Sequence, residues 1–216
     1  MVRMPAPELQ ALLQRQPTVS TATVRPPDFW FLVKVSRETT AESLALGGVG
    51  GVLTGSALEE ARRNDLKRRL FAVDPVDRVR AGMTARLTRE LAPLTFTPYE
   101  ESFERDDAAT MAPVFGERLV MDFKTIDWSM RGEEAGPIVL SYIGRARVFR
   151  PSDNSVLWEG RCRCDEPPTA TAAPLADFMS NRGVLLATRF AALADACTGQ
   201  LVGQFFDRAD PAAPPP

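Results

Sequence analysis

The stretch GPIVLSYIGRARVFRPSDNSVLWEGRCRCDE, residues 136–166, carries the strongest fold signal in the sequence. Two runs rich in β-branched and aromatic residues flank the turn cluster PSDN at 151–154. Pro, Ser, Asp and Asn each favour turn conformations, so such a cluster between two apolar runs is typical of a hairpin. The stretch therefore predicts two antiparallel strands joined by a short turn.

Further elements are predicted on both sides of this hairpin. Two more strands precede it, LTFTPYE at 94–100 and RLVMDFKTIDWSM at 118–130, with an acidic surface helix or loop between them. A Pro/Thr/Ala-rich linker at 167–174 follows it, then a helical turn and a final amphipathic helix at 181–206. In that helix the apolar residues recur at helical spacing, which predicts one buried face.

The N-terminal half contains more helix than strand. Residues 8–16 predict a short helical arm, and a Pro-Pro break then precedes a buried strand at Phe29–Val35. From Thr40 to Leu70 the pattern is that of one long or broken helix. DPVD at 74–77 predicts a helix start, because Asp can cap and Pro suits the first turn. The apolar residues that would share one face of that helix are Val76, Val79, Met83, Leu87 and Leu91.

This order of elements predicts an α+β fold, in which a mostly antiparallel sheet of about five strands has helices packed on one face, an α/β sandwich. We expect an N-terminal arm at 1–24, a single domain at 25–206, and a disordered Pro/Ala tail at 207–216.

Composition excludes several classes of function. The formal net charge is −2, with both signs mixed along the chain, which argues against binding to nucleic acid. The sequence contains no histidine, which removes the commonest general base and metal ligand. No apolar run is long enough to span a bilayer, and the N-terminus lacks the apolar core of a secretory signal. We therefore expect no cofactor and no catalysis, in either a cytosolic protein or a mature form trimmed of its leader.

The glycine-rich stretch LALGGVGGVLTG at 44–55 is the first candidate site. It has neither the Lys-Ser/Thr of a phosphate-binding loop nor the last glycine of a dinucleotide fingerprint. Gly47, Gly51 and Gly55 instead recur every four residues and would line one helix face. We favour tight packing of this stripe on the sheet over docking to a partner or a membrane.

The acidic residues are the second candidate group. Glu100, Glu101, Glu104, Asp106 and Asp107 lack the spacing of a calcium loop. Asp122 and Asp127 are five residues apart and would point to opposite faces of a regular strand. We interpret all of them as solvated surface residues.

The three cysteines give the third candidate site. In a regular strand over 156–164, Cys162 and Cys164 share a face with Trp158, and Cys197 lies on the buried face of the final helix. The helix cysteine therefore faces both strand cysteines, and a bridge from Cys162 would close a loop of about 35 residues. Such a bridge requires an oxidising compartment. The alternatives are three reduced, buried cysteines and, less favoured, a three-cysteine metal site.

The strand–Trp segment, the hairpin ending in VLWEGRC and the helix with ADACTGQLVGQFF resemble the C-terminal half of small, mostly uncharacterised Gram-negative envelope lipoproteins. The glycine-rich segment and DPVDRVRAGMTARLTREL extend the resemblance to about residues 25–206. The resemblance implies Cys162 and Cys197 as the paired cysteines, with Cys164 as an extra. The layout is also similar to auxiliary lipoproteins of envelope ABC transporters and to curli-secretion lipoproteins. This chain departs from the pattern because it has no lipobox cysteine.

The leading hypothesis is a non-catalytic periplasmic protein, anchored to the outer membrane by a lipid in a longer precursor. It would act in envelope assembly or as a transport auxiliary, and bind an envelope protein or a lipid through the glycine helix or the sheet edge. The alternative is a cytosolic nucleotide-binding protein or enzyme that uses the Gly47–Gly55 loop. A homo-oligomer built through the glycine stripe is a third hypothesis.

Overall fold

The computed structural model describes residues 6–34, 60, 64–66, 68–70, 72–134, 136–167 and 173–207. It confirms the α+β fold class, with a six-stranded sheet where about five strands were expected. The strands are β1 (Thr18–Val24), β2 (Trp30–Lys34), β3 (Thr95–Phe103), β4 (Val120–Glu133), β5 (Ile138–Arg150) and β6 (Ser155–Asp165). The helices are α1 (Ala6–Arg15), α4 (Val76–Glu90), α5 (Ala108–Phe115), α6 (Leu175–Met179) and α7 (Val184–Phe205), with a 3-10 turn, η1 (Ser180–Gly183), before α7.

The sheet order is β3-β1-β4-β5-β6, and β2 also pairs with β4. The two longest pairings, β4 with β5 and β5 with β6, are antiparallel, and the second is the hairpin predicted around PSDN. The pairings of β1 with β3, β1 with β4 and β2 with β4 are parallel. The sequence pattern did not predict these parallel pairings, because they join segments far apart along the chain.

The N-terminal residues are not all an arm. The predicted helix is present as α1, whose Leu9 and Leu13 are buried in the main core. Residues 18–24, expected as part of the arm, instead form β1 between β3 and β4. Six of the seven residues of β1 are buried, which only a strand inside a sheet covered on both faces achieves.

The strand expected at Phe29–Val35 is present as β2, but it is only half buried. Phe31 and Val33 face the core, whereas Trp30 and Leu32 are 55% and 49% exposed. An apolar run of this length does not distinguish a strand covered on both faces from one with an open face. The expectation of a buried strand is therefore wrong for one of its two faces.

The helix start at DPVD is confirmed. Asp74 Oδ1 accepts a hydrogen bond from the backbone N–H of Val76 at 3.1 Å, just before α4 begins. The predicted face of α4 is buried, from Val76 through Leu91. The predicted capping position is displaced by one residue, because Pro75 is the N-cap of α4 and makes no side-chain capping bond, so the turn at Asp74 and the apolar spacing define this helix.

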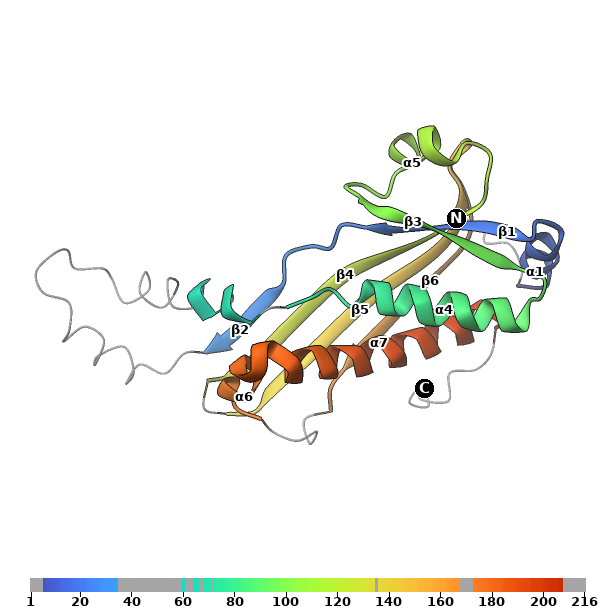
Figure 1. Cartoon of the computed structure of the whole chain (residues 1–216). Helices are drawn as coiled ribbons and strands as arrows, with labels where there is room; N and C mark the ends of the chain where they lie inside the picture. Colours follow the sequence, from blue (N-terminus) through green and yellow to red (C-terminus); the bar gives the residue numbers. More distant parts are fainter. Residues whose placement is uncertain are drawn as a thin grey trace, which may run out of the picture.

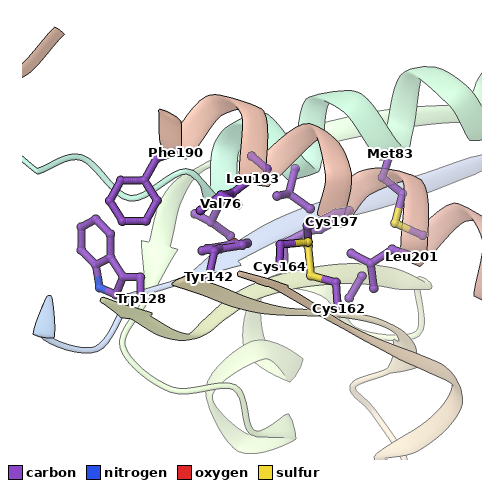
Figure 2. Close-up of a cluster of buried hydrophobic side chains, with 14 of the residues drawn as sticks. Val76, Met83, Trp128, Tyr142, Cys162, Cys164, Phe190, Leu193, Cys197 and Leu201 are labelled. Atoms are coloured by element: carbon purple, nitrogen blue, oxygen red, sulfur yellow. A yellow bond between two sulfur atoms is a disulfide. The ribbon is translucent and has the colours of Figure 1, made fainter. Parts of the chain in front are cut away.

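The main core lies between the sheet and the helix pair α4 and α7, which run side by side across one face (Figure 1). Trp128 packs against Phe190 at one end of α7, with 5.8 Å between ring centroids, and Trp158 packs against Phe205 at the other at 5.1 Å. Figure 2 shows the middle of this cluster, where Tyr142, Cys162 and Cys164 of the sheet lie below α7 and Cys197 points down from it. The sheet residues of this core include Met121, Phe123, Trp128, Met130, Leu140, Tyr142, Val148 and Trp158.

The opposite face of the sheet carries a second, smaller core under α5 (Figure 1). Phe103 of β3, Met111 and Phe115 of α5, and Phe149 of β5 belong to it. Asp107 caps α5, because its side chain accepts a hydrogen bond from the Thr110 backbone N–H at 2.8 Å. Helices therefore lie on both faces of the sheet near β3 and β1, whereas the prediction placed them on one face.

Candidate functional site

The structure joins Cys162 of β6 to Cys197 of α7 in a disulfide, with 5.2 Å between their Cα atoms. This is the pair that the resemblance implied, and both residues are buried (Figure 2). Cys164 is also buried, two residues further along β6, and is outside the bridge. The hypothesis of three reduced cysteines does not hold in this structure. The bridge ties the outermost strand of the sheet to the helix that covers it.

The glycine stripe Gly47, Gly51 and Gly55 lies outside the residues that the structure describes. Its expected packing on the sheet, and the alternative use of Gly47–Gly55 as a loop for nucleotides, stay predictions.

The expectation that all the candidate carboxylates are solvated is wrong for Asp122. Asp122 of β4 has no exposed surface and points away from the main core, between β4 and the start of α5. The expectation that Asp122 and Asp127 face opposite sides is also wrong, because the register of β4 shifts between Thr125 and Asp127. This β-bulge inserts one residue, Ile126, and so returns Asp127 to the face of Asp122.

Asp122 is the centre of a buried ionic cluster. Arg145 Nη2 and Arg147 Nε donate hydrogen bonds to its two carboxylate oxygens, each at 2.9 Å. Arg145 Nη1 also donates to Asp106 Oδ2 at 2.8 Å, and Lys124 Nζ donates to the same oxygen at 3.1 Å. The two arginines lie on β5, directly beside β4, and are almost fully buried. The cluster therefore holds the segment before α5 against the sheet.

The pKa values of the two acids follow from this setting. Burial raises the pKa of Asp122, and the charges and hydrogen bonds of the two arginines oppose that rise. Burial also acts to raise the pKa of Asp106, but the hydrogen bonds and charges of Lys124 and Arg145 outweigh it and lower that pKa to about 2. A carboxylate with this pKa stays ionised at neutral pH and is not suited to proton transfer there.

A pocket of about 430 Å³ lies where β1 gives way to β2. Pro26 and Pro27 have no N–H to donate to the parallel ladder, so the chain leaves β4 after Val24 and returns at Trp30. The bulge at Ile126 lies opposite this interruption. Trp128 Nε1 holds the detour in place by donating to the Pro27 carbonyl oxygen at 2.9 Å. The pocket is lined by Arg25, Pro26, Pro27, Glu104, Lys124, Thr125 and Ile126.

We call the pocket and the exposed side chains of β2 together the β2 surface. Trp30, Leu32 and Ile126 are three of the few large apolar residues that are well exposed in the described part of the chain. The charged groups of the pocket are already paired, since Arg25 contacts Glu104 at 2.5 Å and Lys124 contacts Asp106. The β2 surface therefore offers apolar side chains and an exposed strand, which suits binding more than proton transfer.

The sequence contained partial signals for this surface. Pro26-Pro27 indicated the break, but the bulge has no sequence signature, and without it the pocket is not predicted. The alternation in WFLVK also left open which face is covered.

No helix in the described part of the chain combines the length and the apolar character needed to cross a bilayer. No family model matches the chain, and no curated protein matches it.

Solved structures of similar arrangement have low sequence identity to this chain. A lipoprotein from Neisseria meningitidis is 12% identical, with a TM-score of 0.34, covering 82% of this chain and 99% of that one. A hypothetical protein from Chlamydia trachomatis is 9% identical, with a TM-score of 0.36, covering 87% and 95%. A PelC dodecamer from Paraburkholderia phytofirmans is 10% identical, with a TM-score of 0.33, covering 89% and 91%. Likenesses at this level do not assign the chain to a family.

Proposed function

We propose that this protein is a non-catalytic interaction module of the bacterial envelope, working in the periplasm and held at the outer membrane by a lipid on a longer precursor. The observation that carries the proposal is the disulfide between Cys162 and Cys197. Structural disulfides form and persist in oxidising compartments and are rare in the cytosol. The lipid anchor rests on the sequence resemblance to envelope lipoproteins.

The absence of histidine and the pairing of the charged groups around the pocket support a role in binding without catalysis. The β2 surface supports binding to protein, because an exposed strand edge with apolar side chains is a common site of strand addition. The proposed activity is thus the binding of an envelope partner through the β2 surface.

Counting thiols in the full chain tests the compartment. Protein exported to the periplasm, denatured without reductant and alkylated, is expected to show one reactive thiol, that of Cys164. The Cys164→Ser variant is expected to show none, and Cys197→Ser, in which the bridge is impossible, is the matched positive control. Three reactive thiols in exported wild-type protein would overturn the proposal.

A further inference from the structure

The edge of the sheet at β6 is closed by two side chains of α7. Gln204 accepts a hydrogen bond from the Arg161 backbone N–H at 3.1 Å and donates to the Arg161 carbonyl at 2.7 Å. Gln200, one turn earlier, makes the same pair of bonds with Arg163, at 3.1 and 3.2 Å. Each amide thus takes the place of a neighbouring strand along this edge.

The edge at β3 is protected by its sequence. Pro98 interrupts the row of N–H groups, and the exposed Glu100 and Glu101 place charge on the strand. Proline and charged residues on an edge strand oppose pairing with another chain.

Among the residues that the structure describes, no side chain bonds to the outer edge of β2, and its residues Trp30–Val33 include neither a proline nor a charged residue; Lys34 is the one charge, at the end of the strand. The Lys34 carbonyl accepts a hydrogen bond from Glu134 next to β4, so the backbone groups of Trp30, Leu32 and Lys34 point toward β4. Those of Phe31 and Val33 alternate with them and point outward. The outer edge of β2 thus presents two N–H and two C=O groups.

We propose that β2 pairs with β2 of a second copy of this chain, antiparallel, about a two-fold axis through Leu32. In this register Phe31 and Val33 of one copy lie opposite Val33 and Phe31 of the other. Their outward groups form four hydrogen bonds, because residues that exchange both bonds lie directly opposite each other in an antiparallel ladder. The two-fold axis makes the contact self-complementary.

The exposed side chains fit this register. Leu32 lies opposite Leu32 of the second copy, which covers apolar surface on both. Trp30 lies opposite Lys34, where an ammonium group and an indole attract each other. Other symmetric registers pair fewer residues within Trp30–Lys34. This inference deepens the proposed function and rests on it, since it names the partner of the β2 surface.

Cysteine crosslinking of the full chain tests the register. Directly opposed residues that do not exchange hydrogen bonds have Cα atoms about 4.5 Å apart, within the range of a disulfide. Leu32→Cys is therefore expected to form a covalent dimer under mild oxidation. Trp30→Cys is not, because its two copies would lie roughly 13 Å apart. Val114→Cys, at an exposed position on α5, is a second negative control. A covalent dimer from Trp30→Cys, or none from Leu32→Cys, would overturn the register.

Light scattering tests the association itself. Wild-type protein is expected to reach twice the 23.7 kDa monomer mass as its concentration rises. Leu32→Lys, which places two like charges at the axis, is expected to remain monomeric with an unchanged circular dichroism spectrum. The matched control Val114→Lys is expected to dimerise like wild type. A monomeric wild type that keeps its Cys162–Cys197 bridge would overturn self-pairing and leave the proposed function intact. Three reactive thiols in the exported protein would instead overturn the proposed function.

Discussion

Asp122 is the shared counter-ion of two buried arginines on the face of the sheet opposite the main core. It is fully buried, and both of its carboxylate oxygens accept hydrogen bonds from arginines that are themselves buried. Removing the charge leaves Arg145 and Arg147 without their shared counter-ion. We expect Asp122→Asn to lower the free energy of unfolding by roughly 3–5 kcal/mol, the typical cost of breaking a buried ion pair. Urea unfolding followed by tryptophan fluorescence measures this.

The matched control for Asp122→Asn is Asp153→Asn. Asp153 pairs with Arg150 at the surface at 3.2 Å, and such pairs are worth about 0–1 kcal/mol. Equal losses in the two variants would show that burial does not strengthen the Asp122 pairs.

Asp106 gives the molecule a pH dependence at acid pH. Its pKa in the folded protein is about 2, below the usual aspartate pKa of 3.8, so the folded state favours the ionised form. The resulting stability is fully present above about pH 4 and is lost as the pH falls through about 2. We expect the free energy of unfolding of Asp106→Asn to fall less steeply than that of wild type between these pH values. Parallel slopes in urea titrations would contradict the pairing of Asp106 with Lys124 and Arg145.

The burial of Asp122 and its pairing with two arginines could not be predicted from the sequence pattern. In the run LVMDFK an aspartate between apolar residues is consistent with either a solvated or a buried face. Its partners Arg145 and Arg147 lie two residues apart on the next strand, a spacing that places them on one face of β5. The register of β4 against β5 brings them to Asp122, and register depends on the bulge and on tertiary packing.

At the scale of elements, α7 both covers the main core and closes the edge of β6. Gln200 and Gln204 are four residues apart, so they lie on one side of the helix and reach alternate residues of the strand. Replacing both amides with leucine leaves two N–H and two C=O groups on β6 without these partners. We expect Gln200→Leu/Gln204→Leu to associate beyond the wild-type state, as measured by light scattering over a concentration series.

Gln14→Leu is the control for added surface leucine, because Gln14 is exposed and belongs to α1 and not to a strand. It is expected to keep the wild-type association state. If it associates as strongly as the double variant, apolar surface alone explains the effect and the edge-closing role is wrong.

The elements themselves were largely predictable. The turn at Asp74, the apolar spacing of α4 and α7, and the turn at PSDN are local signals, and the structure contains all three elements, although the N-cap of α4 is Pro75 and not the expected Asp74. The place of β1 was not predictable, because its sequence TVSTATV contains few large apolar residues and its partners lie far along the chain. Its small side chains suit a strand whose two faces are both covered.

At the scale of the whole molecule, the Cys162–Cys197 disulfide connects the sheet to the helix layer that covers its main core. It joins β6, an outer strand of the sheet, to α7, which packs on the sheet and on α4. The resemblance implied this pair, while the alternation of β6 alone left Cys162 and Cys164 both possible. The helix position relative to the strand decides between them, and that is a property of the assembled fold.

Removing the disulfide is expected to weaken the whole fold. The two cysteines are 35 residues apart, and the chain-entropy model gives a crosslink of this length ~3–4 kcal/mol. Cys162→Ala/Cys197→Ala should therefore lower the free energy of unfolding by about that amount in urea titrations. Cys164→Ala removes a buried sulfur without opening a loop, so its loss should be smaller, on the order of 1 kcal/mol. Equal losses would mean that the bridge acts only by filling space in the core and does not restrict the unfolded chain.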